Sequence, residues 1–182
     1  MTTLNTTTTT TQNLRVWDLP TRLFHWSLAA SFVIAFITAE SERWRDIHVA
    51  AGYTMAGLIV FRLLWGFVGS VHARFADFMP TPAKLVAYIK SLLTGQPQHY
   101  VGHNPAGAVA ILLLLGLGLL AAASGWITYQ DMGGHFMEEL HEGLANGMMA
   151  VVVIHIAGVA VSSWLHHENL VKAMITGWKK ST

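Results

Sequence analysis

The sequence predicts an all-α, integral membrane four-helix bundle with both termini cytoplasmic. Its 182 residues are 53% hydrophobic and only 12% charged, about half the charge of a soluble domain. Four apolar stretches each approach the ~20 residues that a helix needs to cross the hydrocarbon core. The charged residues between these stretches divide into a basic set and an acidic set that alternate along the chain. We therefore expect a multi-pass protein whose solvent is the bilayer.

The expected elements follow one another simply along the chain. A threonine-rich polar tail at residues 1–14 has the low complexity that is typical of disorder. The transmembrane domain is expected at residues 15–178, with a second short tail at residues 179–182. Within this domain the spans are expected at about residues 21–39, 48–68, 106–127 and 143–165.

The longest polar stretch, Gly69 to Pro105, separates the second and third spans. Its prolines and the apolar residues from Leu85 to Leu93 indicate a short helix at the membrane interface. Asn104 followed by Pro105 is typical of an N-cap and a first-turn proline, so the third span is expected to begin there.

The basic residues predict the orientation, because cytoplasmic loops carry the excess of Lys and Arg. The two tails and the loop between the second and third spans hold Arg15, Arg22, Arg74, Lys84, Lys90, Lys172, Lys179 and Lys180. The other two loops are net acidic and hold Glu40, Glu42, Arg43, Arg45, Asp46, Asp131, Glu138 and Glu139. An even number of spans places both termini on one side, which we expect to be the cytoplasm.

Composition also excludes several kinds of site. A net charge of +1 gives no footprint for nucleic acid, which requires a concentrated basic excess. The absence of cysteine excludes disulfides, Cys-held iron–sulfur clusters, Cys-ligated zinc and covalent CxxCH haem attachment. Metal chemistry therefore depends on the ten histidines.

Four histidines lie inside or at the ends of the spans, where burying an ionisable group is costly and indicates a function. Each one alone is equally well explained as a neutral ring bonded to a nearby carbonyl. Their depths, however, form pairs: His48 and His141 toward the outer face, His25 and His155 toward the cytoplasm. His141 and His155 are separated by 14 residues, about 21 Å along one helix face.

Two histidine pairs at two depths suit bis-imidazole ligation of two b-type haems, which need axial nitrogen ligands and no cysteine. Gly52, Ala56 and Ala145 lie at one-turn steps from the ligands and leave room for a flat ring. Close packing of transmembrane helices explains Gly52 equally well.

Arg62 is a charged residue within a span, 14 residues after His48 and therefore at the depth of the inner pair. We expect it to pair with a propionate of the inner haem, since a guanidinium binds carboxylates in bidentate fashion. The alternative is an arginine that snorkels to the cytoplasmic interface. The other candidate propionate partners are Arg22 and Arg74 for the inner haem, and Arg43 or Arg45 for the outer one.

The other six histidines are not expected to bind haem. Four of them fall in loops, where a solvated ring is the ordinary case, and two fall at the headgroups beyond the last span: His72, His99, His103 and His135, then His166 and His167.

Several segments together resemble the bacterial cytochrome b561 family, which includes the b-type cytochrome subunits of membrane-bound nickel–iron hydrogenases. The resemblance runs from Arg15 to about Trp178. Its motifs are RVWDLPTRLFHW (Arg15 to Trp26), HxxxGY (His48 to Tyr53), FRLLWGFVGS (Phe61 to Ser70), RFxDF (Arg74 to Phe78), GHNPAGA (Gly102 to Ala108), SGW (Ser124 to Trp126) and the two histidines of the fourth span.

The resemblance implies a di-haem cytochrome of the bacterial inner membrane with ligands at His25, His48, His141 and His155. It also implies electron transfer between an external redox partner, such as a hydrogenase or a c-type cytochrome, and the quinone pool. A free-standing cytochrome of the same family that oxidises superoxide and reduces quinone fits the sequence too. A rival from another class is a His-lined metal or proton carrier, although the spans lack the Asp or Glu that such relays use. A purely structural anchor has no need of four inward histidines.

Overall fold

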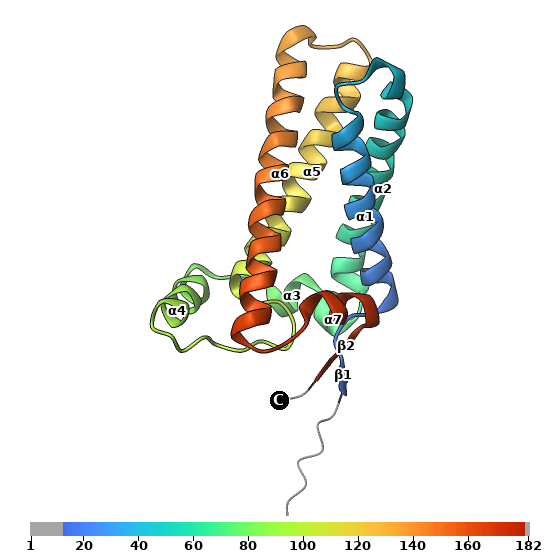
Figure 1. Ribbon diagram of the computed structural model, residues 1–182. Helices are drawn as coiled ribbons and strands as arrows, with labels where there is room; N and C mark the ends of the chain where they lie inside the picture. Colours follow the sequence, from blue (N-terminus) through green and yellow to red (C-terminus); the bar gives the residue numbers. More distant parts are fainter. Residues whose placement is uncertain (1–12, 181–182) are drawn as a thin grey trace, which may run out of the picture.

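The computed structural model describes residues 13–180. Four long helices run side by side as a bundle (Figure 1): α1 (Leu19–Thr38), α2 (Arg45–Val68), α5 (Pro105–Tyr129) and α6 (Gly134–Leu165). All four are long and apolar enough to cross a membrane. Large apolar side chains such as Phe67 and Ile154 face outward, as expected where lipid replaces water. The predicted all-α class and the four spans are confirmed.

The bundle carries additional short elements, so the fold is more than four helices. The described residues also form α3 (Phe75–Phe78), α4 (Pro82–Leu93), α7 (Leu170–Thr176) and the 3-10 helices η1 (Glu42–Trp44) and η2 (Val71–Ala73). Figure 1 places α3, α4 and α7 at the end of the bundle where both chain ends lie. The predicted interfacial helix corresponds to α4.

Two short strands join the ends of the described chain. Strand β1 (Asn13–Arg15) pairs antiparallel with β2 (Trp178–Lys180), with Leu14 opposite Lys179. The backbone N–H of Val16 extends the contact by donating to Gly177 O over 2.9 Å. The described parts of both predicted tails thus pair with each other, while residues 1–12 and 181–182 of those tails lie outside the described residues.

Polar caps begin the helices where the chain leaves a loop. Asp18 accepts a hydrogen bond from the Thr21 N–H at 2.8 Å and caps α1. Asn104 accepts one from the Gly107 N–H at 2.7 Å and caps α5, with Pro105 in the first turn. The predicted start of the third span is confirmed within a residue.

Helix α6 begins at Gly134, nine residues before the predicted span at residue 143. The apolar pattern marks only the stretch that matches the hydrocarbon, whereas a helix of 32 residues is about 48 Å long and extends well beyond ~30 Å. Its first turns carry Glu138 and Glu139, which are exposed. Gly133, at φ +83°, permits the tight turn that leads into this extension.

The helices pack in sequence-adjacent pairs: α1 along α2 and α5 along α6, with α2 also packing on α5. Midway along the bundle Phe32, Met55 and Met148 form a buried cluster, here called the middle layer, which joins α1, α2 and α6. Met148 lies seven residues from both His141 and His155. The middle layer therefore separates the two depths at which the sequence predicts ligands.

A buried ionic network closes the end of the bundle near the chain termini. Lys179 Nζ lies 2.8 Å from Glu168 Oε2, and the side chains are 7% and 10% exposed. His99 Nε2 lies 2.8 Å from the other oxygen of Glu168, and Lys179 also donates to Tyr100 O at 3.2 Å. Glu168 thus ties the loop before α5 and the last strand to the segment after α6.

We expect Glu168→Gln to lower the free energy of unfolding by about 3 kcal/mol at pH 7, because it leaves Lys179 buried without its counter-charge. Burial raises the pKa of Glu168, but hydrogen bonds from Lys179 and His99 outweigh it and hold this pKa below its ordinary value of 4.5. The stabilisation is therefore present above pH 4.5 and is lost as the pH falls through the lower folded-state pKa.

Thermal unfolding in detergent at pH 7 and in acid measures this effect, with Glu139→Gln as the control. Glu139 contacts only the exposed His135, so its loss should cost little. Equal losses for the two variants at pH 7 would contradict the prediction.

Candidate functional site

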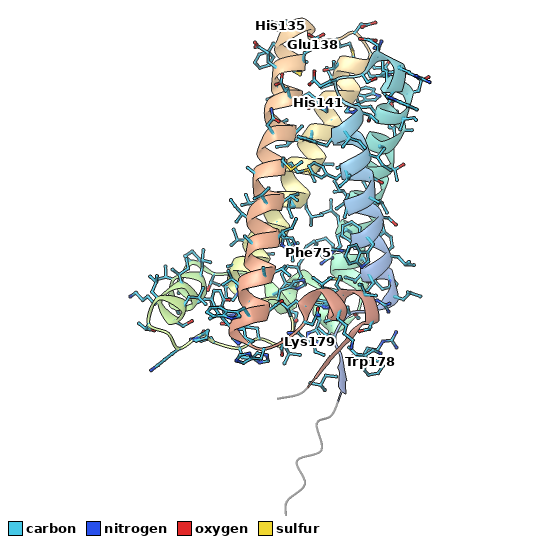
Figure 2. All side chains as sticks on the ribbon, viewed as in Figure 1. Phe75, His135, Glu138, His141, Trp178 and Lys179 are labelled. Atoms are coloured by element: carbon cyan, nitrogen blue, oxygen red, sulfur yellow. The ribbon has the colours of Figure 1, made fainter. Side chains whose placement is uncertain are left out.

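The ring of His48, near the start of α2, lies against the ring of His141 on α6. Their centroids are 6.0 Å apart and their planes are nearly perpendicular, at 89°. Figure 2 shows His141 in the half of α6 remote from the chain ends, below His135 and Glu138. These are the two histidines that the sequence pairs at the outer depth.

Each ring is oriented by a hydrogen bond to a helix carbonyl. His48 Nδ1 lies 2.8 Å from Ala35 O on α1, and His141 Nδ1 lies 2.9 Å from Ala121 O on α5. Because a carbonyl only accepts, both Nδ1 atoms carry the proton and both Nε2 atoms keep a free lone pair. This is how proteins prepare imidazoles as metal ligands: a bond at one nitrogen determines which nitrogen binds the metal.

A cavity of about 700 Å³ opens beside the two rings. Gly52 and Ala56 line it, as the sequence predicts for a flat group next to His48, and no atom lies within 4 Å of the position that a Cβ on Gly52 would take. Ala145 is not among the lining residues. The cavity is within the roughly 300–1,000 Å³ of cofactor pockets.

The mouth of this cavity is acidic. Glu40, Glu42 and Glu138 line it together with one basic residue, Arg45. The guanidinium of Arg45 also lies 5.8 Å from the ring of Tyr129. Arg43, the other outer candidate for a propionate partner, stacks on its neighbour Trp44 instead and does not line the cavity.

Gly125 packs directly on the ring of His141. A Cβ at this position would lie 2.8 Å from His141 Cε1, closer than van der Waals contact permits. The glycine of the SGW segment therefore allows α5 to approach the ring that Ala121 orients.

The inner pair, His25 on α1 and His155 on α6, lies beyond the middle layer. The two rings are near enough to interact electrostatically. His25 Nδ1 is buried, and no partner for it lies among residues 13–180. Because buried polar atoms are nearly always hydrogen-bonded, this nitrogen is available to a group beyond the described residues.

Arg62 is buried near the inner end of α2, with 3% of its surface exposed. Its Nη2 donates to Ala73 O over 2.9 Å, and its guanidinium carbon lies 5.0 Å from the ring of Phe75 and 5.8 Å from that of Phe78. Its Nη1 is buried with no partner in the described part of the chain. The head of Arg62 is therefore shielded from solvent by the described residues, which favours a bound partner over the snorkelling alternative.

The other basic candidates at this end behave differently. Arg22 donates from its guanidinium to Ile175 O, and its Nε is buried without a partner among the described residues. Arg74 is exposed. Of these three arginines, Arg62 and Arg22 thus present buried donors.

The loop histidines are not uniformly solvated. His135 is exposed as predicted, but it lies in the first turn of α6 and not in a loop. His72 and His99 contact Asp77 and Glu168. His103 departs furthest: its ring packs between Trp17 and Phe78, with both centroids 4.6 Å away, and its Nδ1 is buried. His103 is half-buried and not freely solvated as predicted, because α3 and the segment before α1 cover part of its ring.

Sequence reasoning missed the groups that orient the ligands. Ala35 and Ala121 act through backbone carbonyls, so their residue type carries no signal. In the sequence, Gly125 stood out only as part of the SGW segment. The available clue was that it lies one helical turn after Ala121, on a helix that faces a histidine.

Together these residues fit a b-type haem. They supply two imidazoles with free Nε2 atoms, a cavity lined by small side chains, and buried donors without partners for acidic groups. Within residues 13–180 no cluster of three or more His, Cys, Asp or Glu is placed to hold a bare metal ion.

The chain is similar to known cytochromes. The family model for prokaryotic cytochrome b561 matches residues 16–177. The chain is similar to a probable Ni/Fe-hydrogenase B-type cytochrome subunit of Azotobacter chroococcum mcd 1, at 26% identity over 90% of this chain and 87% of the relative. A protein of the same description from Rhizobium leguminosarum bv. viciae is 26% identical over 91% of this chain and 88% of its own length. No solved structure matches.

We expect Gly125→Ala to lower the haem content of the purified protein. The added Cβ displaces the His141 ring, and the ring cannot move without losing its hydrogen bond to Ala121. Gly116→Ala on the same helix is the matched control, because nothing lies within 4 Å of its added Cβ. Haem per polypeptide and the reduced-minus-oxidised absorption spectrum measure the effect; identical spectra for the two variants would refute this role of Gly125.

Proposed function

Because the chain belongs to the prokaryotic cytochrome b561 family, we propose that it carries electrons between an external redox partner and the quinone pool. Membership makes it a b-type cytochrome with haem b, an electron-transfer protein of the bacterial inner membrane. We propose two haems, one held by His48 with His141 and the other by His25 with His155. Bound haem supplies a reversible one-electron couple.

The observation that carries the proposal is the pair of Nδ1 to carbonyl hydrogen bonds at His48 and His141. They leave one nitrogen of each ring free on α2 and α6, beside a cavity of suitable size. Two imidazoles at one iron leave no open coordination position, which favours outer-sphere electron transfer over binding of oxygen.

We propose that both termini face the cytoplasm. The strand pair β1–β2 places the two ends of the described chain together, and this end carries the basic residues that the positive-inside rule assigns to the cytoplasm. The pair His48 and His141 then lies toward the external face, and His25 with His155 lies toward the cytoplasm.

The acidic residues that line the outer cavity favour some electron donors over others. Carboxylates at Glu40, Glu42 and Glu138 oppose the approach of an anion such as superoxide and attract a partner with a basic surface. The mouth therefore favours a protein donor over the superoxide-oxidising alternative. Since the relatives are named as hydrogenase cytochrome subunits, we propose a hydrogenase as this donor, with a c-type cytochrome as the second candidate.

The rival of another class, a metal or proton carrier, lacks support in the described residues. Residues 13–180 hold no cluster of three or more candidate ligands. The outer site offers two imidazoles, which suits an iron whose other ligands come from a porphyrin.

We propose that Arg62 binds a propionate of the inner haem. Its Nη2 is engaged by Ala73, and its Nη1 is the buried donor without a partner. A carboxylate at Nη1 would satisfy this donor and also balance a guanidinium that is shielded from water.

The proposed function predicts two haems per chain and the loss of the same haem in His25→Ala and His155→Ala. Either change removes one of the two inner imidazoles. Quinone reduction in proteoliposomes should then stop, because the cytoplasmic half of the route is gone, while the outer haem signal remains.

Haem extraction and reduced-minus-oxidised spectra give the count, and His135→Ala, exposed at the outer end, is the control. A reproducible value of one haem or none in fully loaded protein would overturn the two-haem proposal. Depletion of different haem signals by the two inner variants would overturn the pairing.

We expect Arg62→Leu to weaken binding of the inner haem by about 2–5 kcal/mol, as when one partner of a buried charge pair is removed. The midpoint potential of the inner haem should move negative as a positive charge leaves. The outer haem, about 21 Å away along α2, should hardly respond. Potentiometric titration resolves the two, with Arg43→Leu as a charge-matched control at the outer end; an inner haem unchanged in occupancy and potential would disprove the role of Arg62.

A further inference from the structure

His103 is held rigidly at the inner end of the bundle. It immediately precedes the α5 N-cap Asn104, and its ring is tilted by 48° against Trp17 and by 54° against Phe78. These contacts join the segment before α1 to α3. The orientation of the ring is thus determined by the fold and not by a polar partner.

The Nδ1 of this ring is shut off from solvent, and no hydrogen-bond partner for it lies within residues 13–180. Native proteins rarely leave a buried polar nitrogen unpaired, since it loses its bond to water without replacement. The nitrogen therefore indicates a partner that the described residues do not supply.

Arg62 presents a second unpaired donor to the same region. Phe78 is a neighbour of both residues, with its ring 4.6 Å from that of His103 and 5.8 Å from the guanidinium carbon of Arg62. Arg62 is 3% exposed, and its Nη1 is buried without a partner among the described residues. Two buried donors thus flank one aromatic ring.

The charge of His103 decides what its Nδ1 can do. Burial, together with the positive charge of Arg62, lowers the pKa of His103 to about 3. The ring is therefore neutral at physiological pH, with one N–H and one acceptor nitrogen. The guanidinium of Arg62 can only donate hydrogen bonds. If the proton of His103 is on Nδ1, one anion can accept from both residues.

The nearby carboxylates of the chain are already engaged. Asp18 accepts from Thr21 N and from Trp65 Nε1, and Asp77 lies 3.0 Å from His72 Nδ1. An acceptor for Arg62 and His103 thus lies outside the described residues, and a bound carboxylate has the geometry to accept from both.

We propose that His103 donates from Nδ1 to the carboxylate that Arg62 binds, and that this carboxylate is a propionate of the inner haem. The inference rests on the proposed inner haem and adds a cofactor-binding residue outside the four spans. His155 lies near enough to His103 to interact with it electrostatically, so His103 is close to an inner ligand. Two donors from two elements hold the propionate more firmly than Arg62 alone.

Three substitutions separate donation from packing. His103→Phe keeps an aromatic ring between Trp17 and Phe78 but removes the donor. His103→Asn places an amide N–H near the position of Nδ1, whereas His103→Gln extends its amide toward the position of Nε2. His135→Phe, at the exposed opposite end, controls for loss of a histidine.

The readout is redox-induced infrared difference spectroscopy on protein whose haem carries ¹³C in the propionate carboxyl groups. We expect the ¹³C-sensitive carboxylate band to shift in His103→Phe and His103→Gln and to return to the wild-type position in His103→Asn. Transfer of haem to an excess of an apo haem-binding acceptor should be about tenfold faster in the two variants without the donor, as for the loss of a hydrogen bond to a charged group.

The outcomes distinguish this inference from the proposed function. A wild-type protein without an inner haem overturns both. An inner haem whose ¹³C band is the same in wild type, Gln and Phe variants overturns only the role of His103. A band that depends on His103 but is insensitive to the label assigns the carboxylate to another source and overturns the propionate. If His103→Phe does not fold, the difference in the carboxylate band between His103→Asn and His103→Gln still tests whether Nδ1 is the donor.

Discussion

The hydrogen bonds from His48 to Ala35 and from His141 to Ala121 connect the architecture of the bundle to its chemistry. Each joins a helix to its sequence neighbour, α2 to α1 and α6 to α5. In hydrocarbon no water competes for the imidazole, so a helix carbonyl is the partner at hand. The same bonds determine the tautomer. The packing of the two helix pairs therefore also determines which nitrogen of each ring is free, and the cavity between the pairs receives those nitrogens.

Span number, helix type and the outer histidine pair were predictable because each leaves a periodic or compositional trace. A helix rises 1.5 Å per residue, so the positions of His48 and His141 within their spans give their depths directly. The acceptors at Ala35 and Ala121 leave no such trace, since every residue has a carbonyl. Gly125 was unpredictable for a similar reason. It is needed because the ring of His141 packs against it from another helix, and a local sequence pattern does not report such a tertiary contact.

The start of α6 and the burial of His103 show two further limits. Hydropathy reports the part of a helix in contact with lipid, so the polar turns from Gly134 onward were not recognised as helix. His103 was assigned to solvent because it lies in a loop, where a solvated histidine is the ordinary case. Its burial depends on Trp17 and Phe78, which are distant in sequence and reach it only after the strands β1 and β2 and helix α3 are in place.

The middle layer of Phe32, Met55 and Met148 has a bearing on energy conservation. These side chains are 7%, 6% and 3% exposed, and apolar packing of this kind excludes water. A proton needs a continuous file of hydrogen-bonded water or side chains to cross the bilayer, whereas an electron can tunnel through packed hydrocarbon. On the proposed two-haem route, a layer of three apolar residues between the two histidine depths would let electrons pass while it insulates the membrane against proton leak, so that the voltage across the membrane would be preserved.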